Sequence, residues 1–127
     1  MLRETTVAIV GSGLAGIGLG LRLAEKGIDC LILTKSELAS GSSVWAQGGI
    51  AAVLDPKDSF DAHIQDTLRA GAGLCHDAAV RTVVEGAPAA IRWLSHAGVH
   101  FDGGDTSLEG LHLAREGGHS HRRVAHV

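Results

Sequence analysis

The sequence has little of several features that mark common protein classes. Its two cysteines, Cys30 and Cys75, are too few for a disulfide framework, and we expect both to be reduced thiols in a cytosolic protein. Lysine and arginine total 11 against 14 aspartates and glutamates, and this net charge of −3 argues against a nucleic-acid binder. The uncharged stretch over residues 5–21 lies at the short end of the ~17–25 residues of a membrane span. Glycines interrupt it, so we expect no span.

Glycine, in contrast, is abundant, with 18 of the 127 residues. The glycines are not periodic, which excludes collagen and repeat arrays. A hydrophobic content of 45% and a mean hydropathy of +0.18 argue against disorder. The glycines fall in short clusters, where the backbone can approach a ligand closely. The length allows one small domain, and the glycine distribution indicates a ligand-binding one.

The first third of the sequence predicts a βαβ unit. Residues 6–10 are apolar and largely β-branched, which is typical of a strand buried on both faces. A glycine turn follows, then a helical pattern over about residues 14–26 that ends at Gly27. Residues 29–34 form a second apolar strand pattern. We therefore expect an α/β fold with a Rossmann-like parallel pair and a right-handed crossover.

The middle of the sequence predicts a loop and then a helix. Residues 35–49 are rich in serine and glycine and indicate an irregular loop, followed by a short apolar run over residues 50–54. A helical pattern covers residues 60–70, and either Asp58 or Ser59 is a suitable cap for its N-terminus.

Beyond this helix we expect two shorter helices and a loop. Asp77 is a suitable cap for the first, which we expect Gly86 to break. Pro88 fits the first turn of the second, which ends at Gly98. Residues 102–127 then predict a loop that holds four of the eight histidines.

The glycine turn at residues 11–16 has the GxGxxG spacing of a dinucleotide-binding turn. In this motif Gly11 allows a tight turn, Gly13 lets the backbone approach a pyrophosphate, and Gly16 allows close packing of helix and strand. The acid that usually ends the second strand is missing, and Lys35 lies there instead. A lysine suits the 2′-phosphate of NADP or another way of holding an adenine nucleotide. The motif by itself does not choose between FAD and NAD(P).

Two longer segments resemble a known family. The run GSSVWAQGGIAA over residues 41–52 resembles the second flavin-contacting segment of the succinate dehydrogenase/fumarate reductase flavoproteins, and Lys35 is also similar to that family. The run HLAREGGHSHRR over residues 112–123 resembles the branch that oxidises L-aspartate to iminoaspartate for quinolinate and NAD synthesis. The resemblance covers residues 7–126. It implies the FAD-binding part of an incomplete doubly wound domain.

The resemblance also implies roles for individual residues. The turn would contact the FAD pyrophosphate, Lys35 would lie near the adenosine, and residues 42–49 would run along the flavin. Glu116 would face the ammonium group of the substrate. Ser42 lies where succinate-oxidising relatives carry a flavin-linking histidine, so we expect non-covalent FAD. The implied cofactor-binding residues are Gly11, Ser12, Gly13, Leu14, Ala15, Gly16, Lys35, Ser42, Ser43, Val44, Trp45, Ala46, Gln47, Gly48 and Gly49.

At the level of function, the resemblance implies a cytoplasmic enzyme that passes electrons from L-aspartate to O₂ or fumarate, with quinolinate synthase as a pathway partner. We expect residues 1–127 to be the N-terminal portion of the FAD-binding domain, without its remainder or the substrate-capping domain. No catalytic acid or base is assigned within the chain. Two alternatives stay open, a succinate- or fumarate-linked flavoprotein fragment and an inactive fragment that binds FAD or NADP.

The histidines of the last segment suggest a metal site as a further possibility. His119 and His121 are two residues apart, and no cysteine lies near them, so their spacing matches no recognised zinc pattern. We therefore expect no metal. The adjacent Arg122 and Arg123 are too few in an acidic chain to indicate nucleic-acid binding.

Overall fold

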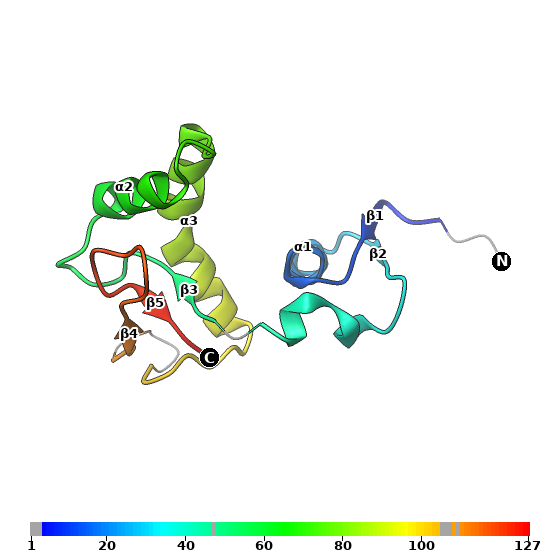
Figure 1. Cartoon of the computed structure of the whole chain (residues 1–127). Coiled ribbons are helices and arrows are strands. Elements are labelled where there is room, and N and C mark those ends of the chain that lie inside the picture. The colour runs from blue at the N-terminus through cyan, green and yellow to red at the C-terminus, as the bar shows by residue number, and fades with distance from the viewer. Residues whose placement is uncertain (1–3, 47, 105–107, 109) are drawn as a thin grey trace. The chain divides into compact units, whose positions relative to one another are not determined.

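The computed structural model describes residues 4–46, 48–104, 108 and 110–127, and the chain divides into two compact units. The first unit is Met1–Gln47 and the second is Gly48–Val127. Figure 1 shows α1, β1 and β2 in the first unit and α2, α3 and the remaining strands in the second. No helix among the described residues is both long and apolar enough to cross a membrane.

The first unit is the predicted βαβ unit. Strand β1 (Val7–Val10) is followed by helix α1 (Leu14–Glu25) and strand β2 (Cys30–Leu33). The two strands pair in parallel, with Val7 opposite Cys30 and Val10 opposite Leu33. The prediction of a Rossmann-like parallel pair is therefore confirmed.

The expected burial of both strand faces is wrong for this unit. Gly20 of α1 lies against Ile9 and Ile32, so the helix covers the face of the sheet that carries these side chains. Ile9 is buried, but Val10 is 85% exposed and Leu33 is 47% exposed. The hydrophobic pattern of the strands is that of an interior strand, whereas one helix on a two-stranded sheet covers one face.

The serine- and glycine-rich stretch over residues 35–49, predicted to be an irregular loop, contains short helical turns. Two short 3₁₀ turns, η1 (Leu38–Ser40) and η2 (Ser42–Val44), lie within the serine- and glycine-rich stretch. Strand β3 (Ile50–Ala51) then begins the sheet of the second unit. Of the short apolar run over residues 50–54, only the first two residues form a strand.

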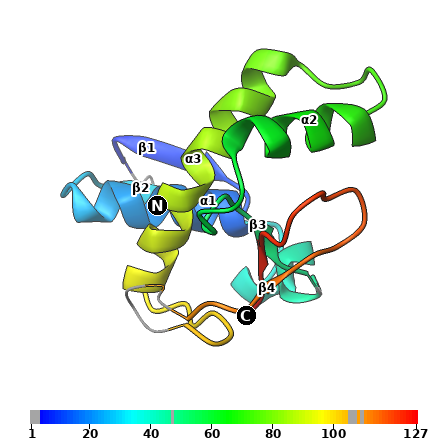
Figure 2. The same cartoon turned by 90° about the vertical axis from the view of Figure 1, so that its left-hand side faces the viewer.

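Helix α2 (Phe60–Ala70) has the predicted bounds. Of the two candidate caps, Ser59 is the one used, because its side-chain oxygen accepts a hydrogen bond from the Ala62 N–H at 3.1 Å. Ile64 is buried, and the helix packs against the next helix along the chain (Figure 2).

Helix α3 (Asp77–His96) corrects the prediction of two shorter helices. It is continuous through Gly86 and Pro88, and His76 rather than Asp77 is its N-cap. Val84, Pro88, Ile91 and Ser95 are buried at helical spacing, so packing along one face outweighs the hydrogen bond that proline cannot donate. The helix ends as predicted at Gly98, whose φ is +100°.

The segment predicted as a loop over residues 102–127 contains two short strands. Strands β4 (Leu113–Ala114) and β5 (Val124–Ala125) join β3 in an antiparallel sheet of order β3-β5-β4. The core of this unit consists of buried side chains from this sheet, from α3 and from the segments beside them: Ala52, Ile91, Phe101 and Ala125. The sheet was missed because two-residue strands leave too little alternation in the sequence to be recognised.

Candidate functional site

The glycine turn of the first unit has the geometry that its spacing predicts. Gly11 has a φ of +109°, a conformation that favours glycine, and its N–H donates to the Leu33 carbonyl at 2.8 Å. A Cβ on Gly16 would lie 2.1 Å from the Gly11 carbonyl oxygen. Gly11 therefore makes the turn, and Gly16 lets α1 pack closely against it.

The N-terminus of α1 is only partly capped. Its N-cap, Gly13, provides no side-chain cap, and no acidic residue lies in the first turn. The nearest atom to a Cβ built on Gly13 is the Ser43 hydroxyl oxygen at 3.8 Å, and that oxygen also accepts the Leu14 N–H at 3.2 Å. Unpaired N–H groups and the positive end of a helix dipole bind anions. The site therefore fits a pyrophosphate.

A cavity of about 310 Å³ lies at the carboxyl ends of β1 and β2, where ligands bind in open parallel sheets. It brings the glycine turn and Lys35 together. A second cavity of about 300 Å³ shares Ser12 and Gly41 with the first and is also lined by Leu14, Ser43 and Val44. The first cavity is lined by Val10, Gly11, Ser12, Gly13, Leu33, Thr34, Lys35, Ser36, Ser40 and Gly41.

The other predicted cofactor residues are not among the residues that line these two cavities. Ala15 and Gly16 form the first turn of α1. The rest of the predicted flavin loop is divided between the two units, with Ser42, Trp45 and Ala46 exposed in the first and Gly48 and Gly49 in the second. Gln47 lies outside the described residues. The course of this loop along a flavin stays a prediction.

The second unit contains a buried ion-pair cluster around Arg123, whose side chain is fully buried. Its Nε and Nη2 donate to the two carboxylate oxygens of Asp58, both at 2.8 Å. Its Nη1 donates to Asp66 Oδ2 at 2.7 Å. The same oxygen accepts the backbone N–H of Ser120 at 2.7 Å and its hydroxyl at 2.6 Å. We call these four residues the Arg123 cluster.

The charges of the Arg123 cluster stabilise one another. Burial opposes ionisation of both carboxyls, but hydrogen bonds from Arg123 and neighbouring backbone N–H groups outweigh it and lower the pKa of Asp58 and Asp66. Burial likewise opposes the charge of Arg123, and its bonds to the two aspartates raise its pKa. The cluster thus joins the start of α2, the middle of α2 and the residues before β5.

Glu116, the predicted substrate-binding residue, lies between β4 and β5. Its Oε1 is 3.1 Å from His126 Nε2, and the Glu116 side chain is 49% exposed. Arg115 donates from Nε to the carbonyl of His119 at 3.0 Å. No pattern in the sequence predicts that His126 lies beside Glu116.

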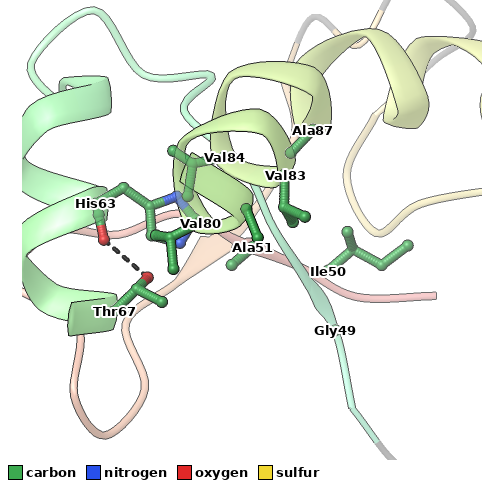
Figure 3. A pocket seen from close by; sticks show the side chains of 10 residues that line it. Gly49, Ile50, Ala51, His63, Thr67, Val80, Val83, Val84 and Ala87 are labelled. Carbon is green, nitrogen blue, oxygen red and sulfur yellow. Dashed lines mark hydrogen bonds between the residues drawn. The ribbon is translucent and has the colours of Figure 1, made fainter. Parts of the chain in front are cut away.

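An apolar cavity of about 560 Å³ lies between β3, α2 and α3 (Figure 3). The buried His63 lines it, and the Nδ1 atom of this side chain has no hydrogen-bond partner. Burial lowers the pKa of His63, and the positive charge of Arg123 lowers it further. The other lining residues are Gly49, Ile50, Ala51, Thr67, Ala79, Val80, Val83, Val84 and Ala87.

The Arg123 cluster was missed at the level of sequence. The sequence suggested Asp58 only as one of two candidate helix caps, and Arg122 and Arg123 only as a pair too small to indicate nucleic-acid binding. The available signal was on α2, where His63 and Asp66 lie three residues apart among the apolar residues of the buried face. Within the described part of the chain, no group of three histidine, cysteine, aspartate or glutamate side chains is placed to hold a metal ion.

Comparison with known proteins identifies relatives over almost the whole chain. The sequence model of the FAD binding domain family matches residues 6–127. L-aspartate oxidase 1 of Ralstonia nicotianae is 54% identical over 121 residues, covering 95% of this chain and 22% of the relative. The L-aspartate oxidase of Pseudomonas aeruginosa is 50% identical over 126 residues, covering 95% of this chain and 23% of the relative. The chain therefore spans less than a quarter of the length of either relative.

Two solved structures have a similar fold over nearly the whole chain. Mycobacterium smegmatis Sdh1 in complex with UQ1 has a TM-score of 0.87 at 30% sequence identity, over 98% of this chain and 21% of the other. A quinol-fumarate reductase with menaquinol molecules has a TM-score of 0.85 at 27% identity, over 97% of this chain and 21% of the other. Both structures are from the flavoprotein family that the two longer sequence segments resemble.

Proposed function

Because this chain belongs to the FAD binding domain family, we propose that it forms part of an L-aspartate oxidase, an enzyme that oxidises L-aspartate to iminoaspartate. Its cofactor is FAD, as the family match indicates. The observation that carries the choice of substrate is the 54% identity to an L-aspartate oxidase over 95% of the chain, a range that includes the segment around Glu116. The chain contributes part of the FAD-binding domain of that enzyme.

The first unit holds the pyrophosphate and adenosine end of FAD. Residues 12–15 lie against the pyrophosphate, a role supported by the lack of a capping side chain on Gly13 and of acidic residues in the first turn of α1. Lys35 lines the same cavity and lies near the adenosine. Residues 42–49 run along the flavin. FAD, when bound, supplies the acceptor for the hydride that leaves the α-carbon of the substrate.

Glu116 binds the ammonium group of L-aspartate. A carboxylate and an ammonium group form a charge-assisted hydrogen bond, and the ammonium is the group that distinguishes aspartate from succinate. The exposure of Glu116 leaves it accessible to a small substrate, and no lysine or arginine among the described residues forms an ion pair with it. Groups that transfer protons in the reaction are not assigned to this chain.

Several finer points belong to the same proposal. FAD is bound non-covalently, because Ser42 offers a hydroxyl where a flavin-linking histidine would be needed. Electrons pass to O₂ or fumarate, and the product enters quinolinate and NAD synthesis, with quinolinate synthase as the pathway partner. The two free thiols, Cys30 and Cys75, fit a reducing compartment, and we place the protein in the cytoplasm.

A second candidate function is a succinate- or fumarate-linked flavoprotein. The similarity to Mycobacterium smegmatis Sdh1 and to a quinol-fumarate reductase supports this alternative. The identities of 30% and 27% to these proteins are lower than the 54% and 50% to the two L-aspartate oxidases. The same comparison therefore favours L-aspartate.

The test is to measure cofactor and substrate on the purified protein. We expect FAD, and not NADP, to bind with 1:1 stoichiometry, and denaturation to release all of the flavin. Addition of L-aspartate should bleach the flavin absorbance anaerobically and yield iminoaspartate, whereas succinate should not. Bleaching by succinate would support the second candidate. Binding of NADP in place of FAD would overturn the proposal.

Glu116→Gln gives the residue-level test. Glutamine keeps the size of the side chain and removes the charge that attracts the ammonium. We expect the KM for L-aspartate to rise at least about 10-fold, in line with the loss of a charge-assisted bond. FAD content should stay unchanged. The matched control is Glu85→Gln, an exposed glutamate on α3, which should leave both quantities as they are.

A further inference from the structure

The environment of Glu116 contains a feature that the proposed function does not explain. Three arginines lie within seven residues of Glu116, yet none of them pairs with its carboxylate in the described structure. Arg115 donates to the His119 carbonyl at 3.0 Å, and Arg122 donates to the Leu113 carbonyl at 3.5 Å. Arg123 is fully committed to Asp58 and Asp66. The one basic side chain on Glu116 is therefore an imidazole, that of His126.

The difference between an imidazole and a guanidinium matters for a carboxylate that must accept a substrate ammonium. Arginine carries a permanent charge and binds carboxylates in a bidentate manner, so it would neutralise Glu116 and compete with the substrate. An imidazole carries no permanent charge and donates to a carboxylate through a single N–H. It therefore holds the carboxylate in position without the permanent counter-charge of a guanidinium.

His126 is itself fixed by the fold. Its backbone carbonyl accepts the Asp102 N–H at 2.9 Å, and it directly follows β5, which pairs with both β3 and β4. At the other end of β5, Arg123 is anchored in its cluster. The His126 side chain is 33% exposed and that of Glu116 is 49% exposed, so both are accessible to a small molecule.

We propose that His126 is a positioning residue that holds Glu116 in place without a permanent counter-charge and thereby sets the preference for a substrate with an ammonium group. This inference rests on the proposed function of Glu116. His126 contributes no proton or bond to the reaction. Its effect is on the binding of L-aspartate and not on the binding of a dicarboxylate that lacks the ammonium.

Substitution of His126 tests this proposal in two opposite ways. His126→Arg places a permanent cation on Glu116, and we expect the KM for L-aspartate to rise at least about 10-fold, with kcat nearly unchanged, because ground-state binding is lost. His126→Gln places an amide N–H near the position of Nε2, and we expect a KM within about threefold of the original value. The inhibition constant of succinate against L-aspartate should stay the same in both variants.

Two controls separate positioning from a general effect on the fold. His96→Arg adds the same charge at an exposed residue of α3, and we expect it to leave the KM unchanged. In a double-substitution cycle, His126→Arg should have no further effect once Glu116 is glutamine, because the carboxylate that it would neutralise is gone. FAD content and the urea unfolding midpoint report the integrity of each variant.

The outcomes distinguish this inference from the function on which it rests. If the unsubstituted protein does not respond to L-aspartate, the proposed function falls and this inference falls with it. If L-aspartate is oxidised and His126→Arg leaves its KM unchanged, the inference alone is overturned. An equal loss of affinity for L-aspartate and succinate, or a persistent effect in the Glu116→Gln background, would also overturn it. Should His126→Arg fail to fold, His126→Lys carries the same charge and the same expectation.

Discussion

The two units of this chain obtain their structure in different ways. In the first unit the defining contacts are between backbone atoms and glycines, and apolar side chains such as Val10 and Leu14 remain exposed. In the second unit a closed apolar core lies beside a fully buried arginine with two aspartates. The first unit is thus built to face other molecules or segments, whereas the second is stabilised by its own interior. The apolar residues of the first unit therefore remain partly exposed, whereas those of the second unit form a buried core.

The largest effect is expected from Asp66→Ala in the second unit. This change leaves the buried Arg123 with one carboxylate partner instead of two, and removal of one partner from a buried pair costs about 3 kcal/mol or more. Urea unfolding followed by the fluorescence of Trp93, in a Trp45→Phe background, measures the loss in this unit. Glu85→Ala, which breaks an exposed pair with Arg81, should cost no more than about 0.5 kcal/mol. Equal losses would contradict the contrast between buried and exposed pairs.

The next effect is expected from Gly16→Ala in the first unit. The added Cβ would lie 2.1 Å from the Gly11 carbonyl oxygen, so either the turn or α1 must move. We expect a loss of about 1–3 kcal/mol in stability and a fall of at least about 10-fold in FAD affinity. Hydrogen exchange of α1 and titration with FAD are the measurements.

Gly18→Ala is the matched control for this change. Gly18 lies two residues after Gly16 in the same helix, and a Cβ at this position would have no neighbour within 4 Å. Replacement of a helical glycine by alanine should stabilise α1 by about 0.5–1 kcal/mol and leave FAD affinity intact. A similar loss of FAD in both variants would show that the close approach at Gly16 is not the cause.

A smaller effect is expected from Ser59→Ala at the start of α2. The change removes the acceptor for the Ala62 N–H and should lower the stability of the second unit by about 1 kcal/mol. The corresponding position in α1 is Gly13, which has no side-chain cap to lose. Ser59→Asp retains an acceptor and should restore most of the stability. Urea unfolding of the three proteins makes the comparison, and equal midpoints would exclude a contribution from this cap.

The smallest effect is expected from mild acid. Burial lowers the pKa of His63 from its usual 6.5, so the unfolded chain binds a proton more readily than the folded one. The stability of the second unit is therefore complete above pH 6.5 and falls as the pH drops through that value. His63→Gln should remove this dependence in urea unfolding measured between pH 8 and pH 5. A dependence that persists in the variant would assign it to another group.

Stronger acid acts on the carboxyls of the same unit. The pKa values of Asp58 and Asp66 are lowered in the folded state from 3.8. Their stabilising contribution is present above that value and is lost as the pH falls further below it. Hydrogen exchange between pH 5 and pH 3 should therefore show α2 losing protection, and Asp66→Asn should reduce the change.

The sequence predictions were accurate for features that depend on residues close together in the chain, and less accurate for features that depend on contacts between distant residues. The parallel pair, the turn at Gly11 and the bounds of α2 were predicted correctly, because short patterns of glycine, apolar residues and a capping serine determine them. Gly86 and Pro88 led to a wrong break in α3, because their low helix propensity was outweighed by burial of one helix face. Lys35 lines the same cavity as the glycine turn, because the ends of two paired parallel strands lie side by side.

By itself, the sequence determined the βαβ unit, its glycine turn and the flavoprotein resemblance. These depend on local sterics, since only glycine fits where a Cβ would meet the Gly11 carbonyl. Only the tertiary structure decided that Arg123 is buried and that His126 contacts Glu116. Asp58 and Asp66 lie 65 and 57 residues before Arg123, a separation at which no sequence period is informative. Burial of an arginine is costly without its partners, so its location becomes evident only when folding brings those partners together.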